Sequence, residues 1–165
     1  MYTTLRVKNE EPREVFLIVH GVRSAENVGS MFRTSDGAGV SHVYLHANTP
    51  QPKDKFGRVN SKIAKVALGA ESSVSWSNYT SISSLLKKLK NSGFAIVALE
   101  QDKKSITWRN IPKSNKIAIV VGHEVDGLDK KIIAKCDYVA EIPMLGKKES
   151  LNVSVATAIM LYSLI

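Results

Sequence analysis

Three uninterrupted apolar runs most strongly constrain how this chain of 165 residues can fold. They are residues 15–19 (VFLIV), 94–99 (FAIVAL) and 117–121 (IAIVV). A strand without polar alternation is covered on both faces, which is typical of a parallel sheet. Val43–Leu45 and Tyr138–Ile142 are two shorter candidates. The sequence therefore predicts a buried sheet of five strands.

Helical periodicity lies between these runs. Ile82, Leu85, Leu86 and Leu89 recur at i, i+3, i+4 and i+7, with lysines on the other faces. Alternating strands and helices predict an α/β layered fold. The length fits one domain, so we expect residues 1–165 to form a single domain.

The last segment, Leu151–Ile165, is apolar nearly all the way round a helix. Such a helix needs cover on several sides. It is either an ordinary core helix or a helix whose outer face is covered by a second subunit. The sequence leaves both alternatives open at this point.

Composition excludes several classes of protein. Hydrophobic residues make up 44% and charged residues 23%, the balance of a soluble globular chain. No apolar run approaches the roughly 18 residues of a membrane span, and the first residues are charged, so we expect a cytoplasmic protein without a membrane partner. Cys136 is the only cysteine, and the four histidines lack metal-ligand spacing, so we expect no metal site.

The chain is basic, with 23 Lys and Arg against 15 Asp and Glu and a formal charge of +8. This excess favours a polyanionic partner. It is concentrated in and beside a Pro-containing stretch, Asn48–Asn60, which is predicted to be a mobile loop facing the substrate. The alternative is an ordinary solvated surface. The candidate residues of this region for binding such a partner are Lys53, Lys55, Arg58, Lys62 and Lys65.

The segment after the first apolar run is the first candidate site, because ligands of open α/β sheets bind beyond the carboxyl ends of strands. Asn27 and Gly29 could open a helix whose first amides bind an anion. Arg33 follows about one turn later and could fork onto a phosphate. The alternative is a capped helix with a surface arginine.

Two further turns follow later strands. Gly122 and Gly127 flank Glu124, whose carboxylate could bind backbone or ribose groups, although a plain turn is equally compatible. Ser150 and Asn152 precede the last helix, where they could cap it or orient a ligand.

The sequence motifs of two classes of nucleotide-binding protein are incomplete in this chain. The outer spacing of residues 122–127 matches a phosphate-binding loop, but Leu128 and Asp129 stand where Lys and Ser or Thr are required. Residues 37–39 lack the third glycine of a dinucleotide fingerprint and do not follow a strand. Neither an ATPase nor a nicotinamide enzyme is favoured.

These three segments, in this order, closely resemble the SpoU (TrmH) family of the SPOUT methyltransferases. Its N-x-G-x-x-x-R motif is matched by Asn27, Gly29 and Arg33, and its G-x-E-x-x-G motif from Gly122 to Gly127. The third motif, I-P-M-x-G followed by S-L-N-V-S-x-A, is matched from residue 142 to residue 156 without a gap. A K-x-A-L-G-A segment at residues 65–70 is also similar. The resemblance covers roughly residues 14–165.

The resemblance implies a parallel-sheet α/β fold (the SPOUT fold) with a C-terminal trefoil knot, in a homodimer formed through the C-terminal helix. It implies S-adenosyl-L-methionine as cofactor and S-adenosyl-L-homocysteine as product. The implied catalytic residue is Arg33, supported by Asn27, Glu124, Ser150 and Asn152. The implied cofactor-binding residues are Leu99, Glu100, Gly122, Ile142, Met144, Ser150 and Leu151.

The implied function is an RNA methyltransferase that modifies a ribose 2′-hydroxyl of tRNA or rRNA. We expect Arg33 to grip a phosphate and orient the hydroxyl, because an arginine is a poor base. Many family members carry an additional RNA-binding domain or terminal helices. This chain has no long N-terminal extension and no tail beyond Ile165, so we expect residues 1–165 to be a single SpoU-type domain with no separate RNA-binding domain. Two alternatives are a non-catalytic RNA-binding or ribosome-assembly protein and a knotted enzyme that methylates a base nitrogen.

Overall fold

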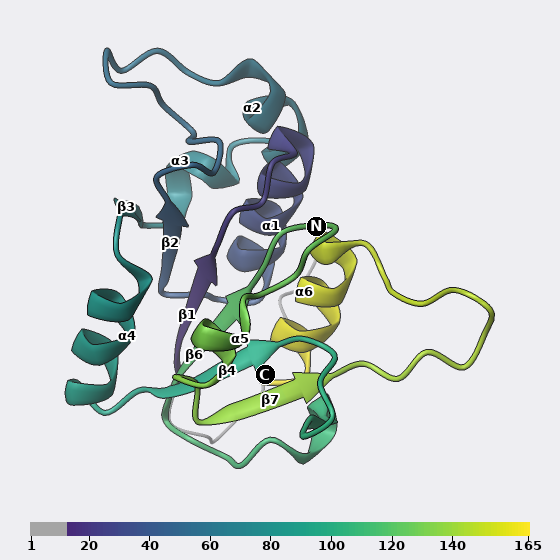
Figure 1. Cartoon of the computed structure of the whole chain (residues 1–165). Coiled ribbons are helices and arrows are strands. Elements are labelled where there is room, and N and C mark those ends of the chain that lie inside the picture. Colours follow the sequence, from purple (N-terminus) through teal and green to yellow (C-terminus); the bar gives the residue numbers. More distant parts are fainter. Residues whose placement is uncertain (1–12) are drawn as a thin grey trace.

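Residues 13–165 are described by a computed structural model built around one parallel sheet (Figure 1). The strand order is β3-β2-β1-β6-β4-β7-β5, and every neighbouring pair is parallel. The strands are β1 (Glu14–Val19), β2 (His42–His46), β3 (Trp76–Tyr79), β4 (Ala95–Leu99), β5 (Ile106–Thr107), β6 (Lys116–Val121) and β7 (Tyr138–Glu141).

Helices cover both faces of the sheet. One face carries α1, α2 and α6, whose side chains, such as Phe32, Ile63 and Met160, join a hydrophobic cluster with the sheet. The other face carries α4 and α5, with Leu86 and Ile132 in a second cluster. The helices are α1 (Ala25–Gly37), α2 (Ser61–Ala67), α3 (Ala70–Ser73), α4 (Ile82–Asn91), α5 (Lys130–Ile133) and α6 (Val153–Tyr162), with a 3₁₀ turn at Trp108–Asn110.

All five predicted strands are present, and the central ones are buried on both faces as expected. Leu17 and Ile18 of β1 point to opposite faces, and each is fully buried in a different cluster. The sequence analysis missed β3 and β5. Both are edge strands: β3 has the largely polar sequence WSNY, and β5 has only two residues. Neither carries the apolar run that marks a buried strand.

The first helix begins at Ala25, two residues before the predicted opening at Asn27. Ser24 is the N-cap of α1, and its hydroxyl accepts a hydrogen bond from the amide of Asn27 at 3.0 Å. Asn27 and Gly29 therefore lie inside the helix. The small size of Gly29 has another use, because a Cβ there would lie 2.7 Å from the carbonyl oxygen of Ile63 in α2. Close packing of α1 on α2 requires this glycine.

The sheet gathers several loops at one edge, because the carboxyl ends of parallel strands lie together. β1 pairs with β6, β6 with β4, and β4 with β7, so the loops after these four strands are neighbours. The chain runs from β1 outward through β2 to β3 on one side, and the later strands fill the other side. Ligands bind at such a switch point in open α/β sheets.

Across residues 13–165, no helix combines the length and the apolarity that a membrane crossing needs.

Candidate functional site

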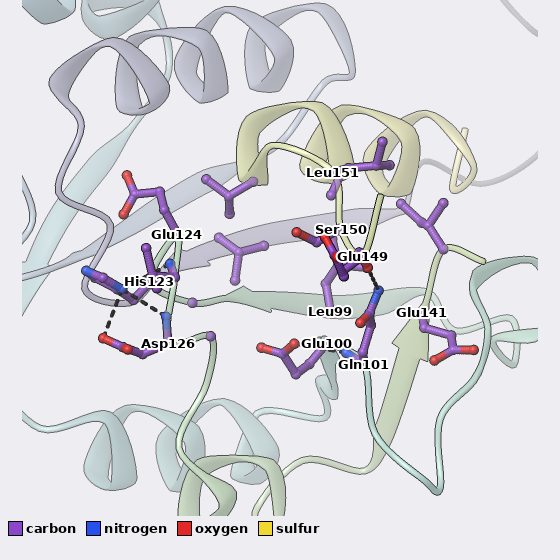
Figure 2. Close-up of a pocket in the computed structure, with 17 residues that line it drawn as sticks. Leu99, Glu100, Gln101, His123, Glu124, Asp126, Glu141, Glu149, Ser150 and Leu151 are labelled. Atoms are coloured by element: carbon purple, nitrogen blue, oxygen red, sulfur yellow. Dashed lines mark hydrogen bonds and ion pairs between the residues drawn. The ribbon is translucent and has the colours of Figure 1, made fainter. Parts of the chain in front are cut away.

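A cavity of about 310 Å³ opens at the carboxyl edge of the sheet (Figure 2). Its walls come from the loops after β4, β6 and β7 and from the first turn of α6. It is lined by Leu99, Glu100, Gln101, Val121, Gly122, His123, Glu124, Val125, Asp126, Gly127, Glu141, Ile142, Glu149, Ser150, Leu151, Val153 and Ala156.

The loop after β6 is a tight turn that leaves no room for a side chain at Gly122. A Cβ there would lie 2.5 Å from the carbonyl carbon of Gly127 and 2.6 Å from its oxygen. The turn is closed by the amide of His123 donating to the Gly127 oxygen and the amide of Gly127 donating to the His123 oxygen, at 3.2 and 3.0 Å. Gly127 also has a φ of +65°, a backbone conformation that favours glycine.

Glu100 fastens this turn to the end of β4. One carboxylate oxygen accepts a hydrogen bond from the amide of Leu128 at 2.8 Å, and the other accepts from the amide of Gln101 at 2.9 Å. The side chain of Gln101 in turn donates to the carbonyl of Glu149 at 2.7 Å, which attaches the long loop after β7 (Figure 2). The three loops therefore form one connected wall.

Glu124 links the same wall to the loop after β1. Its carboxylate accepts hydrogen bonds from the amides of Arg23 and Ser24, at 3.0 and 2.9 Å, and from the side-chain amide of Asn27 at 3.1 Å. Partial burial acts to raise the pKa of Glu124, but these hydrogen bonds outweigh it and hold the pKa below its ordinary value. The carboxylate is therefore ionised and occupied in joining two loops.

Asn27 and Asn152 extend this connection to α6. The Asn152 amide donates to the Asn27 side-chain oxygen at 3.2 Å, while its own side-chain oxygen accepts from the amide of Ser154 at 2.8 Å. Asn152 is therefore both the N-cap of α6 and a contact to α1. Of the two roles that the sequence left open, the structure shows the cap, and the orientation of a ligand stays a prediction.

The charge of the cavity is opposite to that of the whole chain. The lining has five carboxylates, and no lysine or arginine among residues 13–165 contributes to it. A site with this lining repels phosphates and attracts a positively charged ligand. The five acidic residues are Glu100, Glu124, Asp126, Glu141 and Glu149.

Comparison with known proteins identifies the family of this fold and site. The model of the SpoU rRNA methylase family matches residues 14–162. The chain belongs to this family. A putative TrmH family tRNA/rRNA methyltransferase of Staphylococcus aureus is 32% identical over 155 residues, which are 94% of this chain and 60% of that protein. The chain thus spans about 60% of the length of the curated relatives it matches.

Solved structures of SpoU-like proteins are similar over nearly the whole chain. The crystal structure of an AdoMet-bound rRNA methyltransferase from Sinorhizobium meliloti has a TM-score of 0.83 and 25% identity, covering 99% of this chain and 60% of that one. An RNA 2′-O ribose methyltransferase has a TM-score of 0.77 and 25% identity, covering 98% of this chain and 59% of that one. The prediction is confirmed for the family and for the parallel-sheet α/β fold.

Six of the seven residues that the family resemblance implies as cofactor contacts line the cavity. The exception is Met144, which lies half-buried in the loop after β7 and outside the lining. Gln101, Asp126, Glu141 and Glu149 also line the cavity but were not predicted; Gln101 follows the predicted contact Glu100, and the other three lie next to or inside a motif segment. Their acidic or amide side chains beside predicted contacts were the available signal.

The predicted catalytic residues divide into two groups. Glu124 and Ser150 line the cavity, and Asn27 and Asn152 are joined to its wall by hydrogen bonds. Arg33 is outside it: the residue is exposed on α1, six positions beyond Asn27. The catalytic roles of all five stay predictions.

The predicted RNA-binding residues are all exposed, but they do not border the cavity. Lys53, Lys55 and Arg58 lie in the segment after β2, and Lys62 and Lys65 lie on α2.

Among residues 13–165, no group of three or more His, Cys, Asp or Glu is arranged to hold a metal ion. Cys136 is half-buried, and burial raises its pKa to about 11, which favours the protonated thiol at neutral pH.

Proposed function

We propose that this chain binds S-adenosyl-L-methionine in the cavity and transfers its methyl group to a ribose 2′-hydroxyl of tRNA or rRNA, releasing S-adenosyl-L-homocysteine. The observation that carries the proposal is the acidic lining without lysine or arginine. The donor combines a sulfonium, an ammonium and one carboxylate, so it is a net cation. Adenine nucleotides and nicotinamide cofactors carry anionic phosphates and would be repelled.

The remaining lining also suits this donor. Leu99, Ile142 and Leu151 supply apolar side chains against which an adenine ring could pack. The Gly122–Gly127 turn brings backbone close to the cavity, where its amides and carbonyls can bind polar groups of a ligand. The AdoMet-bound state of the similar Sinorhizobium meliloti protein supports the same assignment.

The chemistry needs positioning more than acid or base strength. When bound, the donor supplies a methyl group on a positively charged sulfur, which is already a strong electrophile. Holding reacting groups in line can contribute about 7–11 kcal/mol in favourable cases. The contacts among Glu124, Asn27 and Asn152 fix α1 against the cavity wall and would provide this rigidity.

Arg33 is assigned to the RNA rather than to the donor. A guanidinium keeps its proton at physiological pH, so it is a poor base, but it forks well onto a phosphate. The Arg33 side chain is exposed and has no hydrogen bond or ion pair to other groups of residues 13–165, so it is available to an RNA phosphate. It would orient the neighbouring hydroxyl, whose proton passes to phosphate or water.

The active species is proposed to be a homodimer formed through α6. This helix buries Thr157, Met160 and Leu161, but it leaves Val155 47% and Tyr162 53% exposed. Exposed apolar side chains on a helix that is apolar all round are typical of a subunit interface. By family resemblance, we also expect the C-terminal end of the chain to form a trefoil knot.

The direct test supplies the protein with methyl-labelled S-adenosylmethionine and total RNA lacking its native modifications. We expect label on positions that become resistant to alkaline cleavage, because a methylated 2′-oxygen cannot attack the adjacent phosphate. Label found only on bases would overturn the ribose assignment. An absence of transfer, with RNA binding retained, would favour the non-catalytic alternative.

Arg33→Ala distinguishes a role of Arg33 in RNA binding from a role in binding the methyl donor. We expect transfer to RNA to be abolished while the affinity for S-adenosylmethionine, measured by calorimetry, stays within about twofold, because the side chain does not line the cavity. A large loss of donor affinity would contradict the assignment of Arg33 to RNA.

A further inference from the structure

The basic segment after β2 is a structured hairpin rather than an open loop. Lys53 and Val59 form an antiparallel bridge, and the amide of Asn60 donates to the carbonyl of Pro52 at 2.9 Å. We refer to residues 53–59 as the basic hairpin. The next residue, Asn60, is the N-cap of α2, so the base of the hairpin is anchored to a helix that packs on α1.

Asp54 organises the tip of the basic hairpin. Its carboxylate accepts hydrogen bonds from the amides of Phe56 and Arg58, at 2.8 and 3.0 Å, and binds the Arg58 guanidinium at 2.7 Å. Gly57 completes the turn with a φ of +78°. The only acidic side chain of the hairpin is thus used internally.

This arrangement presents an aromatic ring to solvent. Phe56 is 70% exposed, which is unusual for a phenylalanine in an ordered turn. The Lys55 ammonium lies 5.0 Å from the ring centroid, and the Arg58 guanidinium carbon lies 5.2 Å from it. Two cations therefore flank an aromatic ring that belongs to neither hydrophobic cluster of residues 13–165.

The basic hairpin also lies on the same side of the sheet as the cavity. It follows the carboxyl end of β2, and β2 is the neighbour of β1, after which come Asn27 and Arg33 (Figure 1). The loops after β1 and β2 are therefore neighbours at this edge of the sheet.

We propose that Phe56 is a stacking platform for an unpaired nucleobase of the substrate RNA, with Lys53, Lys55 and Arg58 binding the flanking phosphates. Aromatic rings interleaved with cations are the general means of holding single-stranded nucleic acid. In a duplex the bases are already stacked on one another, so the substrate class is an RNA whose target lies in a single-stranded loop or end. The inference rests on the proposed function in that it requires an RNA substrate.

Stacking can be measured without methyl transfer. The full-length protein is titrated into a fluorescent single-stranded oligoribonucleotide of about 12 nucleotides, and separately into the same strand paired with its complement. We expect Phe56→Leu to weaken single-strand binding by roughly fivefold or more and duplex binding by less than about twofold. Phe56→Tyr, which keeps a π face, should bind like the native protein.

The dependence on salt distinguishes stacking from charge. Phe56→Leu should leave the slope of log affinity against log salt unchanged, whereas Lys55→Ala should reduce it by about 0.7 for a single strand. The inference is wrong if Phe56→Leu binds the single strand like the native protein, if it loses the duplex equally, or if Phe56→Tyr shares the defect. Sedimentation should find the same mass for Phe56→Leu; a change would mean that Phe56 contacts another subunit.

Failure of the inference and failure of the proposed function give different results. A native protein that transfers methyl groups, together with an unaffected Phe56→Leu variant, would refute the stacking role alone. A selective binding defect in Phe56→Leu, together with no transfer by the native protein, would refute the enzyme and keep the stacking surface.

Discussion

The carboxylate of Glu124 stabilises the loop after β1, a role that its place in a catalytic motif does not reveal. It satisfies the amides of Arg23 and Ser24 at the start of α1 and the side chain of Asn27. Unpaired amides at a helix start are a recurring cost in folded proteins. A reaction assay alone therefore cannot assign a catalytic role to Glu124, because its removal also loosens the loop after β1.

Glu124→Gln should lower the free energy of unfolding by about 1 kcal/mol, since solvent access weakens these charge-assisted hydrogen bonds. Glutamine keeps one acceptor oxygen but turns the other into a donor. Because the pKa of Glu124 is lowered, its contribution is complete above its ordinary value of 4.5 and is lost as the pH falls through the folded value. Urea unfolding of both proteins at neutral and acidic pH measures this.

Glu14→Gln is the matched control for that substitution. Glu14 pairs with Lys116 at 3.5 Å, with both side chains more than 40% exposed, and an exposed pair contributes little. We expect little change in stability. Equal effects of the two substitutions at all pH values would contradict the account of Glu124.

His20 gives the protein a second dependence on pH. Its Nδ1 lies 2.8 Å from the Tyr79 hydroxyl, and its ring lies 4.5 Å from that of His46. Burial, and secondly the charge of His46, lower the pKa of His20 below 6.5. The unfolded chain then binds a proton more readily, so stability is complete above pH 6.5 and declines as the pH falls through the folded value.

We expect His20→Gln to reduce the loss of stability between about pH 7.5 and pH 5.5, measured as the shift in the urea midpoint. A residual slope should remain, because burial also lowers the pKa of His42. Identical pH profiles for the variant and the native protein would show that His20 does not contribute.

Among the elements of the fold, the turn from Gly122 to Gly127 leaves no room for a side chain at Gly122. Gly122→Ala would place a methyl group against the Gly127 backbone, which cannot yield as a flexible side chain can. We expect a loss of about 1–3 kcal/mol in the free energy of unfolding.

Gly146→Ala provides the comparison, because a Cβ at Gly146 meets nothing within 4 Å. Thermal unfolding should give a native-like midpoint for Gly146→Ala and a lower one for Gly122→Ala. Equal midpoints would contradict the close approach of Gly122 to Gly127.

The elements that could be predicted from the sequence are those whose buried residues form a clear apolar pattern. β1, β4 and β6 read as uninterrupted apolar runs, and α4 as a clear helical period. The edge strands β3 and β5 could not be found, because a short polar strand at an edge is specified by its neighbour and not by its own pattern.

The individual motifs of the candidate site could be predicted from the sequence, but the contacts that join them could not. Motifs marked Gly122, Glu124 and Asn152, but no local pattern shows that Gln101 binds the Glu149 carbonyl or that Asn152 contacts Asn27. These contacts join segments 48 and 125 residues apart. The acidic character of the cavity was likewise hidden, because its carboxylates come from three separate loops.

For the whole molecule, the exposed face of α6 predicts self-association. Val155→Glu should give a folded monomer in sedimentation velocity, because Val155 is 47% exposed in the single chain and the charge would be buried only in a dimer. Val59→Glu, at a 58% exposed apolar position of the basic hairpin, should keep the native mass. A monomeric native protein, or loss of the dimer in both variants, would contradict the role of α6.

The loops after the buried strands are proposed to form a site for a positively charged methyl donor. Titration calorimetry of S-adenosylmethionine and of ATP measures whether they do. We expect one S-adenosylmethionine site per chain in the native protein and in Gly146→Ala, no binding by Gly122→Ala, and no ATP binding. Equal binding of ATP, or an unchanged affinity for S-adenosylmethionine in Gly122→Ala, would contradict it.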